Sequence, residues 1–190
     1  SIFPGFTVWG ASKALAGSSD LLAVPVPEVH PVFTTLRDSI IIVNRGEKPV
    51  SSSEGHNRMN GHPFAEARVK QAQKNTAELL EALKTGNKQT FMRITENEAF
   101  TLHALMMTSA DGFMLMEPET VRIISRLQQA RKENGLHVCF TLDAGPNIHI
   151  LYFDDESEQV NNLIVEDLLK NNKQNQVLND FYGSGPVKMA

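Results

Sequence analysis

The sequence is poor in several features that mark whole classes of protein. A single cysteine, Cys139, excludes an internal disulfide and makes the cytoplasm the expected compartment. No apolar run approaches the roughly 20 residues that a membrane-spanning helix needs. The net charge of −4 argues against a general surface for nucleic acids or anionic membranes. We therefore expect neither nucleic acid nor membrane as a partner.

Complete motifs for nucleotide binding and nucleophilic catalysis are also missing. The sequence has no G-x-x-x-x-G-K-[ST] or G-x-G-x-x-G loop for phosphates, and no G-x-S-x-G elbow for a reactive serine. Cys139 lies in an apolar segment, where burial makes a thiol unreactive. The six histidines show no spacing typical of zinc. We therefore expect no metal site and no complete cofactor site in this chain.

What remains is the composition of an ordinary globular protein, with 41% hydrophobic and 21% charged residues in a chain long enough for one sizeable core. The first residues, SIFPGFTVWGAS, begin without Met and lack the basic start of a secretory signal. They resemble the interior of a folded protein. This opening predicts that residues 1–37 continue from a missing N-terminal domain and that residues 38–190 form the main domain.

Hydrophobic periodicity and turn residues predict the order of secondary structure. The expected elements are a strand at 39–44, helices at 65–86, 87–106 and 118–135, hairpin strands at 136–142 and 148–153, a helix at 156–170 and a final strand from 176. This order suits an α+β sandwich close to the ferredoxin-like split β-α-β arrangement, with an antiparallel sheet and helices on one face.

The loop of the predicted hairpin, DAGPN, places Asp143 between two apolar strands. Asp, Gly, Pro and Asn are ordinary turn residues, so Asp143 could serve only to form the turn. Alternatively, a short loop between buried strands would hold a carboxylate firmly enough for it to act as a base or positioning group. If Leu142 faces Ile148 across the loop, then Thr141, Asp143 and His149 point to one side of the hairpin. The residues alone leave both readings open.

A second candidate is the loop with consecutive serines at 51–53, followed by Gly55. Hydroxyls and free backbone N–H groups next to a glycine can bind phosphate oxygens, and Arg58 or Lys48 could assist. Serine-rich loops are more often simple solvated connections. The two basic residues are too sparse to identify a phosphate site by themselves.

These segments together resemble a known family. FTLDAGPN, residues 140–147, resembles the signature hairpin of the diphosphomevalonate decarboxylases, which belong to the GHMP kinase superfamily and carry their catalytic aspartate there. SIFPGFTVWG, KPVSSSEG, TLHALM and GSGPV resemble other segments of the same family. The resemblance covers essentially the whole chain, but only the C-terminal half of the enzyme. It implies the fold of a GHMP kinase C-terminal domain for residues 38–190.

The resemblance also implies a function in isoprenoid biosynthesis through the mevalonate pathway. Such enzymes use ATP to phosphorylate the 3-hydroxyl of mevalonate 5-diphosphate, and loss of that phosphate and of CO₂ gives isopentenyl diphosphate. Asp143 would orient or deprotonate the hydroxyl, and its charge would oppose the substrate carboxylate. Ser52 and Ser53 fall in the loop that meets substrate phosphate, while Ala144 and Gly145 would let the backbone approach the substrate. ATP and Mg²⁺ would be bound mainly by the missing N-terminal domain.

The chain departs from the family pattern in two segments. Ser53 stands where the family has a phosphate-binding arginine, and DGFML, residues 111–115, lacks the family's prolines and tyrosine. The family's Gly/Ser-rich ATP loop is missing too, along with the rest of the N-terminal domain, so we expect altered recognition of the diphosphate and no activity from this chain alone. Two alternatives stay open: a GHMP-family kinase acting on another small alcohol, and a non-catalytic ferredoxin-like module for binding or dimerisation. Enzymes of this kind often form homodimers, so a homodimer is also an option.

Overall fold

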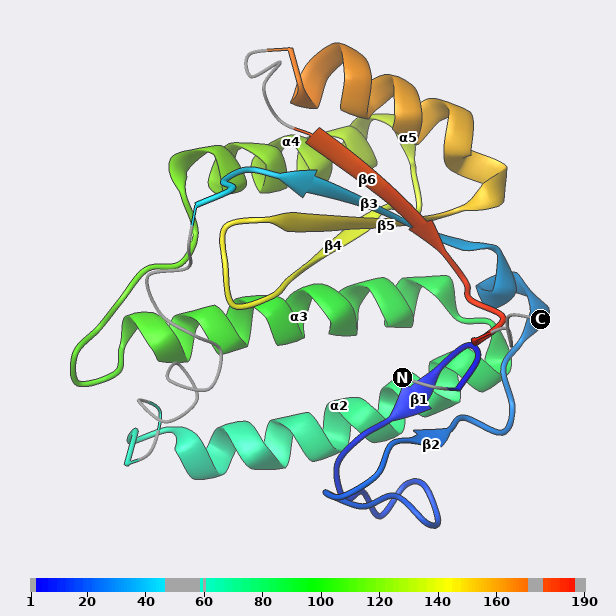
Figure 1. The fold of residues 1–190 in the computed structure, drawn as a ribbon, viewed down its shortest axis with the longest axis vertical. Coiled ribbons are helices and arrows are strands. Elements are labelled where there is room, and N and C mark those ends of the chain that lie inside the picture. The colour runs from blue at the N-terminus through cyan, green and yellow to red at the C-terminus, as the bar shows by residue number, and fades with distance from the viewer. Residues whose placement is uncertain (1–2, 47–58, 60, 171–175, 187–190) are drawn as a thin grey trace.

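A four-stranded antiparallel sheet is the centre of the fold in the computed structural model, which describes residues 3–46, 59, 61–170 and 176–186 (Figure 1). Its strands are β3 (Leu36–Ile42), β4 (Cys139–Leu142), β5 (Ile148–Phe153) and β6 (Gln176–Phe181). They lie side by side in the order β4-β5-β3-β6, and every neighbouring pair is antiparallel. The predicted α+β class with an antiparallel sheet is confirmed.

The strand predicted at 39–44 begins earlier and ends earlier than expected, because β3 spans Leu36–Ile42. It is a central strand, so its backbone is paired on both sides. Asp38, for example, lies opposite Leu151 of β5 and opposite Asp180 of β6. The strand therefore includes polar residues such as Asp38, because their backbones pair with both neighbouring strands. Hydrophobic periodicity alone does not predict these residues as part of the strand.

The helices end where the local signals predict. They are α2 (Ala65–Thr85), α3 (Lys88–Met107), α4 (Pro118–Asn134) and α5 (Ser157–Leu163), which continues into a π-helical turn at Ile164–Leu168. Gly86 and Gly135 close α2 and α4 with left-handed φ angles of 78° and 68°. Asn87 caps α3, since its side chain accepts a hydrogen bond from the backbone N–H of Thr90.

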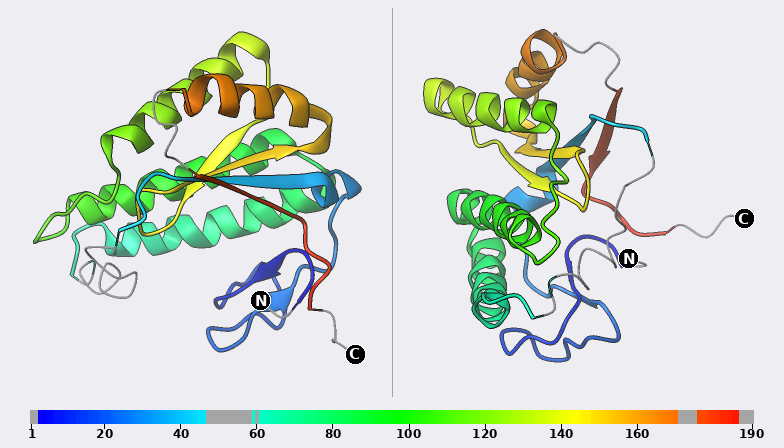
Figure 2. Two further views of the ribbon diagram at one scale, coloured as in Figure 1. Left: turned by 45° about the horizontal axis from the view of Figure 1, so that its top comes forward. Right: turned by 90° about the vertical axis from the view of Figure 1, so that its left-hand side faces the viewer.

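Helices α4 and α5 cover one face of the sheet (Figures 1 and 2). Along the strands, alternate side chains such as Phe140 and Ile150 point to this face and are fully buried. They pack in one hydrophobic cluster with Ile123 and Leu127 of α4 and Val160 of α5. Burial of this cluster holds the sheet against the two helices.

The remaining helices depart from the prediction of a single helical layer. Cys139 and Phe153 point away from α4 and α5, and they are buried in a second cluster with Leu83 of α2 and with Phe91 and Met92 of α3. Helix α3 therefore packs along β4 and α2 packs on α3, and both bury side chains of the opposite face. The prediction of helices on one face holds for α4 and α5 but is wrong for α2 and α3.

The second face is covered only in part. Thr141, His149, Ile40 and Leu178 form one cross-strand row across the whole sheet. Each of these side chains keeps contact with solvent, and Leu178 is 45% exposed. This row borders the β4–β5 loop, so an open stretch of sheet lies beside the predicted site.

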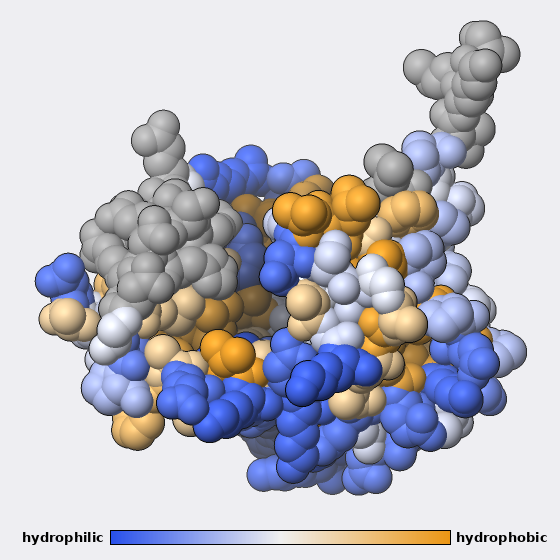
Figure 3. Space-filling model, turned by 90° about the horizontal axis from the view of Figure 1, so that it is seen from below, coloured by the Kyte–Doolittle hydropathy of each residue, from blue (hydrophilic) through white to orange (hydrophobic). Residues whose placement is uncertain are grey.

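The N-terminal residues pack against the end of the described chain. A two-stranded antiparallel sheet of β1 (Thr7–Val8) and β2 (Val24–Pro25) precedes a 3-10 helix at Pro31–Thr35. The ring of Phe6 contacts those of Phe33 and Tyr182, with centroids 6.2 and 5.8 Å apart. Seen from below, the molecule is hollowed, with hydrophobic surface showing inside the hollow (Figure 3). Among the helices of the described residues, none has the length and apolar character to cross a membrane.

Candidate active site

The loop of residues 143–147 connects β4 to β5 and presents an acidic side chain. Leu142 pairs with Ile148, and Thr141 pairs with His149, so the register that the sequence suggested is confirmed. Thr141 and His149 therefore share one face of the hairpin. The side chain of Asp143 is exposed at the start of the loop, and its main-chain carbonyl accepts a 2.8 Å hydrogen bond from the N–H of Gly145.

Hydrogen bonds from other elements fix this loop along its length. Nε2–H of His103 on α3 donates to the carbonyl of Asp143 over 3.1 Å. Oγ1–H of Thr120 on α4 donates to the carbonyl of Pro146 over 2.6 Å. At the end of the loop, Oδ1 of Asn147 accepts a 2.9 Å bond from the N–H of Val43, just after β3. The backbone that carries Asp143 is thus held from three directions.

A small hydrophobic cluster supports the loop from beneath. Ala144 is 8% exposed and packs with Met106 of α3 and with Leu115. Phe113 joins the same cluster, so the DGFML segment places two of its apolar side chains under the loop. Gly112 fits there because an added Cβ would lie 2.8 Å from the carbonyl oxygen of Met107. The segment that departs from the family pattern therefore has a packing role in this chain.

Two histidines flank the loop in different environments. His103 is 1% exposed, and its burial lowers the pKa of the imidazole below 6.5, which favours the neutral form. On the sheet face, Nδ1–H of His149 donates to Oδ2 of Asp38 over 2.8 Å. This hydrogen bond raises the pKa of His149, and the nearby charge of Asp143 adds to the effect. The two imidazoles beside the loop therefore differ in the form they favour, neutral for His103 and charged for His149.

The predicted site residues fall into two groups. Asp143, Ala144 and Gly145 come together in the loop, with the last two buried below the exposed aspartate. Ser52 and Ser53 lie outside the described residues. His103 and Thr120 were not predicted as loop supports, although each is a polar residue on the apolar face of its helix. That pattern is the sequence signal that could have identified them.

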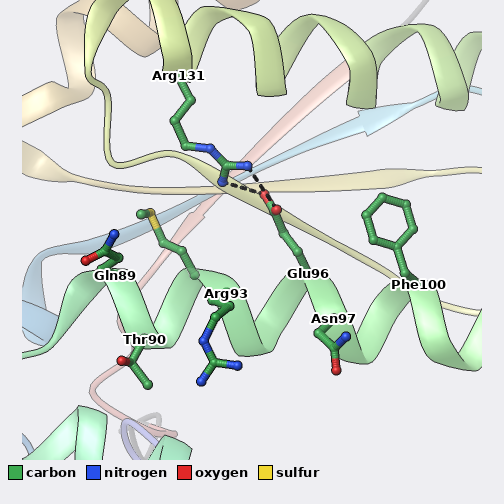
Figure 4. Close-up of a pocket in the computed structure, with 8 residues that line it drawn as sticks. Gln89, Thr90, Arg93, Glu96, Asn97, Phe100 and Arg131 are labelled. Carbon is green, nitrogen blue, oxygen red and sulfur yellow. Dashed lines mark hydrogen bonds and ion pairs between the residues drawn. The ribbon is translucent and has the colours of Figure 1, made fainter.

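A cavity of about 600 Å³ lies elsewhere, beside α3. Arg131 reaches across from α4 and forms a two-pronged ion pair with Glu96, with N–O distances of 2.8 and 3.1 Å (Figure 4). The cavity lining comes from α3 and α4 and includes no residue of the 143–147 loop. We therefore do not assign this cavity to the candidate site.

The loop geometry suits a carboxylate that must keep one position. A group that accepts or orients a proton must lie within hydrogen-bond reach of its partner, and a firmly held backbone supports that precision. The described loop provides such a backbone, with Asp143 exposed on it and an open stretch of sheet at Thr141 and His149 next to it. The arrangement can serve acid-base or electrostatic chemistry on a small molecule bound against that face.

Comparisons with known proteins place this chain in a family. The model of the mevalonate 5-diphosphate decarboxylase C-terminal domain matches residues 39–186. Diphosphomevalonate decarboxylase mvd1 of Aspergillus fumigatus is 26% identical over 84% of this chain. A solved structure of mevalonate diphosphate decarboxylase from Legionella pneumophila is 27% identical over 77% of the chain, with a TM-score of 0.69. A structure of MDDEF in complex with MVAPP, AMPPCP and magnesium is 27% identical over 97% of the chain, with a TM-score of 0.80.

These relatives are much longer than the regions they share with this chain. The chain spans 40% of the Aspergillus protein, 45% of the Legionella chain and 54% of the MDDEF chain. The match extends from the middle of β3 through β6, so it includes the whole β4–β5 hairpin. The chain therefore belongs to the family of mevalonate 5-diphosphate decarboxylase C-terminal domains.

Proposed function

We propose that the complete protein is an ATP-dependent decarboxylase that converts mevalonate 5-diphosphate to isopentenyl diphosphate, ADP, phosphate and CO₂. This chain supplies its C-terminal part. The observation that carries the proposal is an exposed Asp143 on a loop fixed by His103, Thr120 and Asn147, in a chain of this family. The hydrogen bonds are those expected of a loop that positions a reacting carboxylate.

In this proposal Asp143 acts on the tertiary 3-hydroxyl of the substrate. Its carboxylate accepts the hydroxyl proton or orients the hydroxyl for phosphorylation, which is general-base chemistry. The same negative charge destabilises the substrate carboxylate in the closed site and favours its departure as CO₂. Both roles require an ionised side chain in a constant position, which the fixed loop backbone provides.

Other residues of the chain have supporting roles in the proposal. Ser52 and Ser53 contribute to the pocket for the substrate diphosphate. Ala144 and Gly145 are small, so the loop backbone can approach the substrate closely. We assign residues 38–190 to the C-terminal domain, in keeping with a family match that begins at residue 39, and residues 1–37 to a segment that follows an N-terminal domain.

ATP and Mg²⁺ are the proposed cofactors, supported by the relative solved with AMPPCP, an analogue of ATP, and magnesium. Within residues 3–46, 59, 61–170 and 176–186, no group of three or more His, Cys, Asp or Glu side chains could hold a metal ion. We therefore assign both cofactors mainly to the N-terminal domain and to the phosphates themselves. We also assign the enzyme to the cytoplasm, in keeping with a single buried cysteine.

The test uses protein expressed from the complete coding sequence, incubated with ATP, Mg²⁺ and mevalonate 5-diphosphate. ADP and CO₂ release are followed together for the wild type, for Asp143→Asn and for a control, Asp180→Asn. Asp180 is another exposed aspartate, on β6. We expect equal amounts of both products from the wild type and the control, and a loss of about 100-fold or more in Asp143→Asn. Equal activity in the two variants would refute the role of Asp143.

The same assay separates the alternatives. ADP without CO₂ would identify a kinase of the superfamily, an alternative that Ser53 and the altered DGFML segment keep open. Repeating the assay with other small alcohols, including mevalonate 5-phosphate, would then identify its substrate. Neither product with any substrate would favour a non-catalytic binding or dimerisation module. The oligomeric state of the same protein, measured by light scattering, tests the proposed homodimer.

A further inference from the structure

Strand β6 (Gln176–Phe181) forms an open edge of the four-stranded sheet (Figure 1). Among the described strands it pairs with β3 alone, in an unbroken antiparallel register. Most of its side chains are exposed, including Leu178 at 45% and Phe181 at 63%. The backbone groups along its outer side therefore have no strand to bind within the described residues.

The opposite edge of the sheet is covered. Helix α3 packs along β4, and Nη1 of Arg131 donates a 3.2 Å hydrogen bond to the carbonyl of Val138, just before that strand. Strand β6 lacks the usual protection of an edge, since its sequence, QVLNDF, contains no lysine or proline and its pairing with β3 shows no bulge. A regular, exposed edge with apolar side chains is a template for the addition of another strand.

The hydrogen-bond pattern identifies the residues that face the open edge. The N–H of Tyr182, just after β6, donates to the carbonyl of Leu36 on β3. In an antiparallel pair every second residue bonds to the neighbouring strand, so the even-numbered residues of β6 bond toward β3. The N–H and C=O groups of Val177, Asn179 and Phe181 therefore point away from the sheet.

We propose that β6 binds β6 of a second copy of this chain, antiparallel and about a twofold axis at Asn179, so that the two sheets join into one. The three outward residues are spaced symmetrically about Asn179. Asn179 therefore exchanges backbone hydrogen bonds with Asn179 of the second copy, and the N–H of Val177 donates to the carbonyl of Phe181 of the second copy. This surface rests on the homodimer of the proposed function and names its interface.

The side chains of β6 are complementary to themselves in this register. Opposite residues share a face, so Val177 lies against the exposed ring of Phe181 of the second copy. On the other face, Leu178 is a diagonal neighbour of Leu178 of the second copy. Asp180, the one charged residue of β6, lies opposite Leu178 of the second copy. The register thus covers apolar surface on both faces and places no like charges opposite each other.

Charge complementarity favours a second copy over another partner. Asp180 lies opposite Asp38 of β3, so two carboxylates share one face, and Oδ1 of Asp180 accepts a 2.8 Å bond from the outward N–H of Phe181. At the other end of β6, Nη2 of Arg45 donates to Oε1 of Gln176 over 2.8 Å. Gln176 is a diagonal neighbour of Asp180 of the second copy in this register. The twofold axis therefore brings Arg45 of each copy to the Asp180 carboxylate of the other.

The first test traps the register in the complete protein. Opposite residues that exchange hydrogen bonds have Cα atoms about 5.5 Å apart, within the span of a disulfide. Asn179→Cys should therefore form a covalent dimer under mild oxidation, measured by non-reducing electrophoresis. The matched control Leu178→Cys should cross-link roughly tenfold less, because diagonal neighbours lie about 7–8 Å apart. The wild type is a second control, since its Cys139 is buried. Equal cross-linking of the two variants, or none, would overturn the register.

The second test removes the central bonds between the copies. Proline is tolerated on an edge strand where the N–H faces outward, so Asn179→Pro should keep β6 paired with β3. Loss of the two central bonds, at about tenfold in affinity for each, should raise the dissociation constant of the dimer about 100-fold in sedimentation equilibrium. The control Asn179→Ser keeps the N–H and should dimerise as the wild type does. Circular dichroism checks the fold, and the cross-linking result stands without this variant.

A third test reverses the charges. Arg45→Asp and Asp180→Arg should each weaken the dimer about tenfold at low salt, because each variant turns an attraction at both ends of the interface into a repulsion. The double variant should restore most of the affinity. Additive losses in the double variant would contradict the contact between these two residues.

The outcomes separate this surface from the function on which it rests. A wild-type dimer that persists in Asn179→Pro and is not trapped by Asn179→Cys would overturn the surface alone. A monomeric wild type would overturn the surface and the homodimer together. Strand β6 and strand β4 lie at opposite edges of the sheet, so the edge variants should turn over substrate as the wild type does. A wild-type dimer without turnover would overturn the proposed reaction and leave this surface in place.

Discussion

The cavity beside α3 and the β4–β5 loop both carry ionisable side chains near β4, but they differ in what the hydrogen bonds hold. At the cavity, Glu96 and Arg131 bind each other through two hydrogen bonds, and Arg131 also donates to the carbonyl of Val138. At the loop, neutral groups hold the backbone, while the Asp143 side chain is exposed. At the cavity, two charged side chains join α3 to α4, whereas at the loop hydrogen bonds hold the main chain that carries Asp143.

The difference has consequences for mutation. Removing a charge at the cavity leaves its partner without a counter-charge, so the effect should fall on stability. Removing a hydrogen bond beneath the loop should loosen the position of Asp143, so the variant should lose more in activity than in stability. Three sets of variants test this distinction.

Glu96→Gln should have the largest effect on stability. It leaves Arg131 without its carboxylate in a setting where the two side chains are only 12% and 28% exposed. Breaking a fully buried pair costs 3–5 kcal/mol, and partial exposure reduces our estimate here to about 2 kcal/mol. Urea unfolding measures the change. Glu78→Gln, at an exposed pair with Arg93, is the control and should change stability little. A comparable loss of kcat/KM in Glu96→Gln would contradict the separation of the two regions.

Thr120→Val should lower stability less than Glu96→Gln does, but it should lower kcat/KM more. Thr120 is fully buried, and the variant removes the hydroxyl that donates to the carbonyl of Pro146. An unsatisfied buried carbonyl costs about 1–2 kcal/mol. The matched control is Thr76→Val, which removes a hydroxyl bond to the carbonyl of Ala72 within α2, away from the loop. Urea unfolding and kcat/KM are measured on both variants. Equal kcat/KM in the two would show that the loop keeps its position without Thr120.

The two histidines beside the loop should have opposite and smaller effects on the pH dependence of stability. The lowered pKa of buried His103 means that the unfolded chain binds more protons, so stability is lost as pH falls below 6.5. The raised pKa of His149 adds stability that is complete below 6.5 and is lost as pH rises through its folded pKa.

Urea unfolding between pH 5 and 8 measures both contributions. His103→Gln should flatten the loss of stability on the acid side, and Asp38→Asn should flatten the loss at higher pH. Since the second variant removes the main cause of the raised pKa of His149, its effect is specific to that residue. Parallel curves for the two variants and the wild type would mean that neither histidine controls stability in this range.

Much of the fold could be predicted because its signals are local. Gly86 and Gly135 end helices through a backbone conformation that glycine adopts without strain. Asn87 caps α3 through its own side chain, and Pro118 begins α4 where no N–H is needed. The DAGPN loop and its flanking alternation predicted the hairpin, and the register assumed for it, with Leu142 opposite Ile148, is the one observed. Each of these signals lies within a few residues of the structure it specifies.

The layers and the loop supports could not be predicted in the same way. Whether α3 covers the same face as α4 depends on how the elements pack, and both helices have ordinary apolar stripes. The bond from Thr120 to Pro146 joins residues 26 apart, and that from His103 to Asp143 joins residues 40 apart. No local pattern in a single sequence specifies such partners.

By itself, the sequence determined the order of the main elements, the ends of the helices, the hairpin and the candidate carboxylate Asp143, because propensity, capping and turn chemistry act over short distances. Only the tertiary structure decided that α3 lies along β4 with α2 packed on it, that three elements hold the β4–β5 loop, and that Asp38 meets His149 across 111 positions of sequence. Contacts of that range arise from strand pairing and side-chain packing. They bring together residues whose positions along the chain carry no information about each other.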